Sequence, residues 1–132
     1  MMRTRHRVLI VDDEEDILFL WRGALLTPTG AYEVVTACDG CDALEEIARM
    51  PFDLLVTDIR MPRMDGVELT KAIRQLGYQM PVIWFTGVDT PNLAQKAERL
   101  GVYCCLYKPL RVDEMRQVVA EALSDSQKET TL

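Results

Sequence analysis

Residues 54–66 read LLVTDIRMPRMDG, and the fold can be worked out from this stretch because an apolar run in it ends on a single carboxylate. Leu54 to Thr57 has the short apolar character of a strand that is buried on both faces. Asp58 follows at once, and a charge at the edge of a core is costly unless another group neutralises it. Pro62 lies in a short loop, and Asp65-Gly66 starts the next helix. The stretch therefore predicts a strand, a charged site, a loop and a helix in that order.

The size and composition of the chain limit what it can be. Its 132 residues suffice for one domain with a real core and are too few for two ordinary domains. A hydrophobic content of 48% and a charged content of 27% are typical of a soluble globular protein. The net charge of −6 argues against nucleic acid as the main partner. No apolar stretch approaches the roughly 20 residues of a membrane span, and none fits a signal peptide. We therefore expect a cytoplasmic domain without direct contact to nucleic acid or membrane.

Short apolar runs alternate with longer segments of helical period throughout the chain. The expected strands are residues 8–11, 32–37, 54–57, 81–85 and 102–107, and the expected helices are 14–26, 40–48, 66–76, 90–100 and 112–123. Such alternation predicts a mostly parallel sheet with helices on both faces and right-handed crossovers. The expected fold class is α/β: a three-layer, doubly wound (βα)5 fold whose parallel five-stranded sheet has the order 2-1-3-4-5, as in flavodoxin-like proteins.

A single domain is expected over residues 7–123. Residues 1–6 are expected to form an N-terminal leader. A basic cluster runs from this leader into the first strand, and we interpret it as solvated; it comprises Arg3, Arg5, His6 and Arg7. From Ser124 onward the composition turns polar, so residues 124–132 are expected to be a frayed tail or the stump of a linker.

Polar residues stand at the ends of four of the expected strands. Asp12-Asp13 follows the first strand, Asp58 the third, Thr86 the fourth and Lys108 the fifth. Ligands of such sheets gather at the carboxyl ends of the strands, and strands one and three are neighbours in this order. Three carboxylates within about 6 Å of one another repel by several kcal/mol at intermediate dielectric. Clustered oxygens of this kind suit Mg²⁺ or Mn²⁺, so a divalent cation and a lysine are the expected partners of Asp58.

Four motifs in a fixed order point to a family. They are VLIVDDEEDI at 8–17, LLVTDIRMPRMDGVEL at 54–69, VIWFTG at 82–87 and YKPL at 107–110. Together they resemble the receiver domain of bacterial two-component response regulators, over about residues 7–123. The resemblance implies a signalling switch that takes a phosphoryl group from a sensor histidine kinase or a phosphotransfer protein. It implies no separate substrate, so the chain is not expected to be an enzyme beyond its own phosphotransfer and autodephosphorylation chemistry.

The resemblance also assigns the metal and acceptor residues. Asp58 is similar to the phospho-acceptor and is at the same time a ligand of Mg²⁺, or alternatively Mn²⁺. Asp13 is similar to the carboxylate that binds the ion directly, and Asp12 to one that acts through bound water. The backbone carbonyl of Arg60 is implied as a further ligand.

The implied switch residues lie on the fourth and fifth strands. Thr86 is similar to the hydroxyl that turns inward to the phosphoryl oxygens, and Lys108 to the lysine that pairs with the acceptor and then with the phosphate. The Lys108–Pro109 bond is implied to be cis. Where many receivers carry an inward-swinging Tyr or Phe, this chain has Cys105, so the resemblance does not imply a coupled movement of threonine and an aromatic ring here. The fourth helix, fifth strand and fifth helix form the implied surface for an output domain, a partner protein or a phosphorylation-dependent homodimer.

Other residue types that could carry chemistry have plainer interpretations. Cys38-Asp39-Gly40-Cys41 and Cys104-Cys105 could supply zinc or redox ligands, but the strand order places the pairs at opposite edges of the sheet. We interpret all four cysteines as small apolar fillers in a reducing compartment. Trp21 and Trp84 are expected in the core rather than stacked on a ligand.

Three rival functions remain on the same fold. A flavodoxin-like cofactor binder needs a loop after the first strand that welcomes phosphate, whereas residues 12–15 read DDEE and would repel it. A phosphatase with an aspartate nucleophile needs an Asp-x-Asp arrangement that Asp12-Asp13-Glu14 does not offer. A receiver that takes no phosphate and only binds partners is disfavoured by the intact set of Asp13, Asp58, Thr86 and Lys108.

Overall fold

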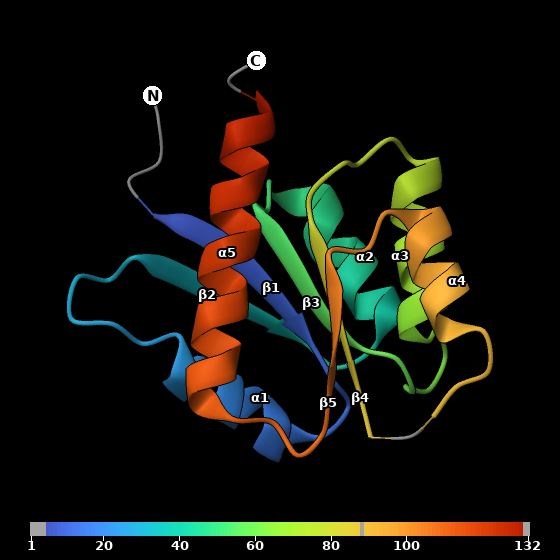
Figure 1. Cartoon of the computed structure of the whole chain (residues 1–132), viewed down its shortest axis with the longest axis horizontal. Helices are drawn as coiled ribbons and strands as arrows, with labels where there is room; N and C mark the ends of the chain where they lie inside the picture. The colour runs from blue at the N-terminus through green and yellow to red at the C-terminus, as the bar shows by residue number, and fades with distance from the viewer. Residues whose placement is uncertain (1–4, 88, 131–132) are drawn as a thin grey trace.

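One parallel sheet organises the molecule (Figure 1). The computed structural model describes residues 5–87 and 89–130, and side chains up to residue 126. The strands are β1 (His6–Val11), β2 (Tyr32–Ala37), β3 (Leu54–Asp58), β4 (Val82–Thr86) and β5 (Cys104–Tyr107). The helices are α1 (Glu15–Ala24), α2 (Gly40–Arg49), α3 (Gly66–Gln75), α4 (Leu93–Leu100) and α5 (Val112–Thr130). All pairings are parallel in the order β2-β1-β3-β4-β5, which confirms the expected fold class.

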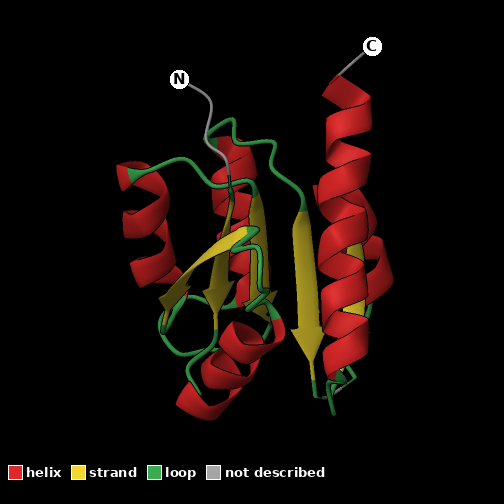
Figure 2. Ribbon diagram, turned by 90° about the vertical axis from the view of Figure 1, so that its left-hand side faces the viewer, coloured by secondary structure: helices red, strands yellow, loops and turns green. Residues whose placement is uncertain are grey.

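The sheet separates two apolar cores, one under each layer of helices. Figure 2 shows the sheet between α5 on one side and further helices on the other. Side chains alternate along β1, so Val8 and Ile10 pack with α1 and α5 whereas Leu9 and Val11 pack with α2, α3 and α4. Because both faces are covered, the central strands are continuous apolar runs and not alternating ones.

Both tryptophans lie in these cores, as the sequence predicts. Trp21 on α1 is fully buried, with its ring centroid 5.6 Å from that of Phe85. Trp84 on β4 is buried on the opposite face, where its Nε1 donates a hydrogen bond to Thr70 Oγ1 on α3 at 2.9 Å. Neither ring is available to stack on a ligand.

The first strand begins earlier than its apolar run. Expected from Val8, β1 starts at His6 because His6 and Arg7 pair in register with Tyr32 and Glu33 of β2. The Arg7 Nε donates to Glu33 at 2.6 Å, so this part of the basic cluster is held in ion pairs and is not a solvated leader. Arg3 lies outside the described residues.

The last helix continues past its apolar stripe. The stripe ends at Leu123, as expected, but α5 runs on to Thr130 in place of a frayed tail. Tyr103 is the residue immediately before β5, and its hydroxyl donates a hydrogen bond to Asp125 at 2.6 Å, which attaches the extension to the domain. Polar composition marked the end of burial here rather than the end of the helix. At α4 the helix is shorter than expected. Asn92 adopts a left-handed conformation, so the helix starts at Leu93 instead of near Thr90.

The buried hydrogen bond between Trp84 and Thr70 gives the first testable prediction. Thr70 Oγ1 accepts from the indole and donates to the Gly66 carbonyl at 2.8 Å. Thr70→Val leaves the buried indole N–H without an acceptor, so the free energy of unfolding should fall by about 1–3 kcal/mol in a urea titration. Thr70→Ser keeps the hydroxyl and should lose less. Equal losses in the two variants would contradict a role for the hydrogen bond.

Candidate functional site

Three carboxylates meet at the carboxyl edge of the sheet, which is the lower edge in Figure 1. Val11 of β1 pairs with Thr57 of β3, so the two strands end at the same level. As a result Asp12, Asp13 and Asp58 each place an oxygen within 4.8 Å of the others. This is the convergence that the strand order predicts.

Asp58 is the last residue of β3 and is held from two sides. Its side chain is only 5% exposed, and Oδ1 accepts a hydrogen bond from the Ile59 backbone N–H at 2.7 Å. Oδ2 accepts from the Lys108 Nζ at 3.3 Å. Burial raises the pKa of Asp58, and the charge of Lys108 opposes that rise. The Asp58 carboxylate is therefore buried, oriented and next to the Lys108 ammonium.

Asp12 is fully buried and only half satisfied. Its Oδ1 accepts a hydrogen bond from the Glu14 N–H at 2.9 Å. Oδ2 receives no hydrogen bond from any described group and lies 3.7 Å from the Lys108 Nζ. Burial raises the pKa of Asp12 to about 7, and the nearby charge of Asp58 adds to the effect. A buried carboxylate oxygen without a donor, beside two further acids, is what a divalent cation or its bound water would satisfy, so these residues fit Mg²⁺ or Mn²⁺.

Lys108 enters the site from the end of β5. Its backbone N–H donates to the Thr86 carbonyl at 2.8 Å, and the Lys108–Pro109 bond is cis, as the resemblance implies. The ammonium also lies 5.5 Å from the centroid of the Phe85 ring. Burial works against the charge, but Asp58 and Asp12 outweigh it and raise the pKa of Lys108. The lysine therefore stays protonated between the acids.

Thr86 and Cys105 lie where the sequence placed them, and Tyr107 is the aromatic residue that follows Cys105 on the same strand. Thr86 ends β4 at 1% exposure and pairs in register with Tyr107, whereas Cys105 pairs with Trp84. Residues two apart share a face of a strand, so Tyr107 lies beyond Cys105 toward the site edge, 56% exposed. Burial raises the pKa of Cys105, and a hydrogen bond from Tyr107 opposes this. The aromatic ring is thus displaced by two residues along β5.

The loop between β3 and α3 lies directly against the end of β3. The Gly66 N–H donates to the Ile59 carbonyl at 2.8 Å, and a Cβ at residue 66 would overlap the Asp58 carbonyl oxygen, so only glycine fits here. Asp65 and Glu68 form a capping box that starts α3 immediately afterward. Arg60, the implied carbonyl ligand, lies in this loop, directly after Ile59.

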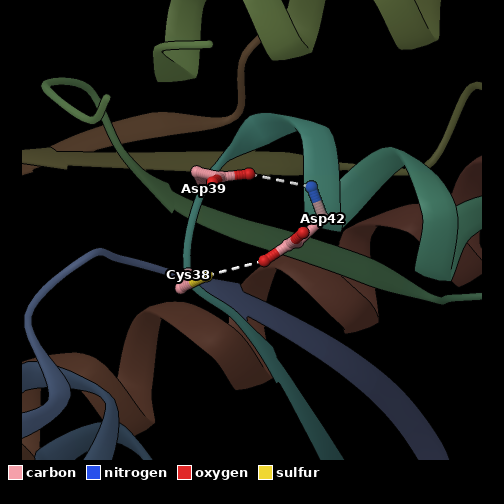
Figure 3. A group of neighbouring side chains, drawn as sticks. All are labelled: Cys38, Asp39 and Asp42. Atoms are coloured by element: carbon pink, nitrogen blue, oxygen red, sulfur yellow. Dashed lines mark hydrogen bonds between the residues drawn. The ribbon is translucent and has the colours of Figure 1, made fainter. Parts of the chain in front are cut away.

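A second cluster of possible metal ligands lies at the start of α2, where the sequence suggested only that Cys38 and Cys41 could supply zinc or redox ligands. Figure 3 shows Cys38, Asp39 and Asp42 together, with ligand atoms within 4.8 Å of one another. Cys38 is exposed and its thiol donates to Asp42 at 2.6 Å, so it is not the apolar filler that the sequence suggested. Arg63 neutralises both acids, at 2.6 Å from Asp39 and 3.1 Å from Asp42. The guanidinium already supplies positive charge to both carboxylates, so this cluster needs no metal ion to offset them.

The four cysteines are free thiols, and the two pairs lie at opposite edges of the sheet, next to β2 and on β5. Hydrogen bonding to Asp42 raises the pKa of Cys38, and burial raises the pKa of Cys104 to about 11. Both shifts keep the thiols protonated and poorly nucleophilic.

Comparison with known proteins agrees with this site. The family model of the response regulator receiver domain matches residues 8–120, and the chain belongs to this family, whose members are signalling switches. It is 38% identical over 117 residues to the sensor histidine kinase RcsC of Escherichia coli, covering 85% of this chain and 12% of RcsC. It is also 38% identical over 119 residues to the transcriptional regulatory protein GlrR of Escherichia coli, covering 90% of this chain and 26% of GlrR. The chain therefore spans about a quarter or less of the length of these relatives.

Solved structures show the same domain. A CheY-like receiver domain protein from Methanospirillum hungatei has a TM-score of 0.86 at 29% identity, with 95% of this chain and 98% of that chain covered. The receiver domain of AraT from Geobacillus stearothermophilus has a TM-score of 0.83 at 36% identity, with 95% and 98% covered. Among the described residues, no helix combines the length and the apolar character needed to cross a bilayer.

The raised pKa of Asp12 predicts a pH dependence of stability in the metal-free chain. The folded pKa of about 7 exceeds the ordinary value of 3.8, so the folded state holds this proton more tightly than the unfolded state does. Stability from this group is therefore complete at low pH and is lost as the pH rises through about 7. We expect the free energy of unfolding, measured with urea in the presence of EDTA, to fall from about pH 5 to about pH 8.

The control for this prediction is Asp12→Asn, which cannot ionise. Its stability should decline less over the same pH range and should exceed that of the wild type at the alkaline end. Asp58 keeps part of the slope, because its pKa is also raised. An identical decline in both chains would show that Asp12 is not the titrating group.

Proposed function

We propose that Asp58 accepts a phosphoryl group from the phosphohistidine of a sensor histidine kinase or a phosphotransfer protein. The observation that carries the proposal is the buried Asp58 carboxylate, 3.3 Å from the Lys108 ammonium and grouped with two further acids. Membership of the receiver family and the kinase and regulator relatives support it. The output of the signal is either an attached output domain or a separate partner protein.

The chemistry is an in-line displacement at phosphorus. An oxygen of Asp58 forms the new P–O bond while the P–N bond to the donor imidazole breaks, and the imidazole leaves with the electron pair. Both reactants are anionic, so Lys108 contributes by offsetting their repulsion at the Asp58 Oδ2. The Ile59 N–H holds Oδ1 and thereby orients the carboxylate. The product is an acyl phosphate that water can cleave, which suits a reversible signal.

The residues proposed to hold Mg²⁺, or Mn²⁺, are Asp13 and Asp58 directly, Asp12 through water and Arg60 through its carbonyl. Such an ion supplies positive charge to the acids and to the incoming phosphoryl oxygens when bound. The unsatisfied Asp12 Oδ2 supports the assignment.

The signal is proposed to leave through α4, β5 and α5. Thr86 lies at the end of β4, where its hydroxyl is proposed to turn to the phosphoryl oxygens while Lys108 shifts from carboxylate to phosphate. With Cys105 in the usual aromatic position, threonine movement alone is proposed to change this surface. Its readers are an output domain, a partner protein or a second phosphorylated copy, in a cytoplasmic setting without direct nucleic-acid contact by this domain.

Two of the three rival functions, the pseudo-receiver and the flavodoxin-like cofactor binder, rank lower for physical reasons. A pseudo-receiver that only binds partners has no need of a lysine held between buried acids. A flavodoxin-like cofactor site would place a phosphate beside Asp12, Asp13 and Glu14, whose charges would repel it.

Asp58→Asn tests the acceptor. Incubating the chain with acetyl phosphate and Mg²⁺ should add one phosphoryl group to the intact mass, and Asp58→Asn should abolish the adduct because an amide cannot form the acyl phosphate. Asp113→Asn, which changes an exposed acid at the start of α5, should keep it. An adduct that survives in Asp58→Asn would place the acceptor elsewhere.

Lys108→Ala tests the division of labour within the site. The fold and much of the Mg²⁺ affinity should remain, whereas the change in amide hydrogen exchange across α4, β5 and α5 on treatment with acetyl phosphate should be blunted, because the ammonium links phosphate to β5. Lys71→Ala, an exposed lysine of α3, is the control. Loss of Mg²⁺ binding as complete as in Asp13→Ala would contradict this role.

A further inference from the structure

Arg63 fastens the β3–α3 loop, residues 59–65, to the first turn of α2. Its Nε donates to Asp39 Oδ2 at 2.7 Å, and its Nη2 lies 2.6 Å from the same oxygen and 3.1 Å from Asp42 Oδ1. Asp39 is only 4% exposed, and its Oδ1 caps α2 by accepting the Asp42 N–H at 2.9 Å. The carboxylate that receives Arg63 is therefore itself immobilised by the helix that it starts (Figure 3).

The backbones of the loop and of α2 are also in direct contact. The Gly40 N–H donates to the Met64 carbonyl at 3.1 Å. A Cβ at residue 40 would lie 2.6 Å from the Met64 Cγ, closer than real contacts allow, so this approach requires glycine. Arg63 thus reinforces a contact in which the loop already touches the helix.

The backbone at Arg63 has a conformation that needs such support. Its φ is +65°, in the left-handed region that residues with a side chain rarely adopt. The Met64 N–H donates to the Pro62 carbonyl at 2.7 Å, which closes a tight three-residue turn around Arg63. A turn of this kind persists when the surrounding structure holds it, and here the side chain of its central residue does so.

The other end of the loop is fixed at the phospho-acceptor. The Ile59 N–H bonds the Asp58 carboxylate, and Arg60 follows directly, between that anchor and Arg63 three residues later. We infer that Arg63 is a positioning residue, whose ion pairs with Asp39 and Asp42 hold the β3–α3 loop so that the Arg60 carbonyl is ready to bind the divalent cation. Groups that orient a metal ligand from outside the ligand set raise affinity because the site need not be ordered on binding. This inference rests on the proposed function and adds residues that the acceptor chemistry does not use.

Calorimetric titration of the full chain with MgCl₂ tests the inference directly. Arg63→Ala should weaken the Kd about tenfold, the lower end of what changes outside the ligand set cost metal sites. Arg63→Gly removes the ion pairs but suits the backbone, so it separates the two effects and should weaken the Kd as well. Arg49→Ala removes an exposed ion pair with Glu46 on the same helix and should leave the Kd unchanged. Wild-type affinity in Arg63→Gly would overturn the inference.

A double-mutant cycle identifies the partner of Arg63. Asp39→Asn keeps an oxygen to cap α2 and removes the charge. If Arg63 acts through Asp39, the double variant Asp39→Asn with Arg63→Ala should bind Mg²⁺ no more weakly than Arg63→Ala alone. Additive losses would show that the two residues act separately and would overturn the inference.

Two further readouts separate positioning from general stability. In the metal-free chain, amide hydrogen exchange at Gly40 and Met64 should accelerate in Arg63→Ala and should stay at the wild-type rate in Arg49→Ala. With acetyl phosphate, Arg63→Ala should be phosphorylated slowly at low Mg²⁺ and at the wild-type rate when Mg²⁺ saturates. A lower rate at saturating Mg²⁺ would assign Arg63 to the chemistry and overturn a positioning role.

The outcomes distinguish the inference from the function beneath it. If the wild type binds neither Mg²⁺ nor Mn²⁺, the proposed metal site and this inference both fail. If it binds Mg²⁺ but Asp58 takes no phosphoryl group, the acceptor role fails and the calorimetric comparison still decides the role of Arg63. If it is phosphorylated and all variants bind Mg²⁺ equally, only the inference fails.

Discussion

Repulsion among buried carboxylates governs the site at the carboxyl edge of the sheet. Asp12 and Asp58 are almost fully buried, Asp13 adds a third acid, and Lys108 lies within 4 Å of the first two. In a low-dielectric setting both the repulsion and the attraction to the lysine are strong. Burial raises the pKa of both Asp12 and Asp58, the charge of Asp58 adds to the rise at Asp12, and the charge of Lys108 opposes the rise at both. The excess of negative charge over the single ammonium is what would attract a divalent cation.

The rest of the fold keeps these charges at one place. Strands β1, β3 and β4 are buried on both faces, so two cores hold their ends in register. Gly66 lets α3 start next to Asp58, because a residue with a Cβ would overlap the Asp58 carbonyl oxygen. The Thr86 carbonyl accepts a hydrogen bond from the backbone N–H of Lys108. Because each group is fixed through the backbone of a strand or a helix start, the site is ordered before any ligand arrives.

The receiver domain is a shared module that occurs in proteins of different kinds. Its relatives RcsC and GlrR, named as a kinase and as a transcriptional regulator, contain the matched segment within much longer chains. Around the site, this chain carries Cys105 with Tyr107 beyond it on β5, and the ion pair between Arg63 and Asp39. The first pair lies on the strand that ends next to Lys108, and the ion pair holds the β3–α3 loop against α2.

The order of the strands, and the acids, hydroxyl and lysine at their ends, could be predicted from the sequence, because hydrophobic period is local and parallel strands finish at one edge. Two features emerged only from the folded chain: the Asp12 Oδ2 without a hydrogen-bond donor and the pairing of Arg63 with Asp39 across 24 residues. Such contacts join side chains from separate loops and strands and leave no periodic trace. The extension of α5 escaped prediction for a related reason: burial shows as a pattern of apolar residues, whereas a solvated helix shows none.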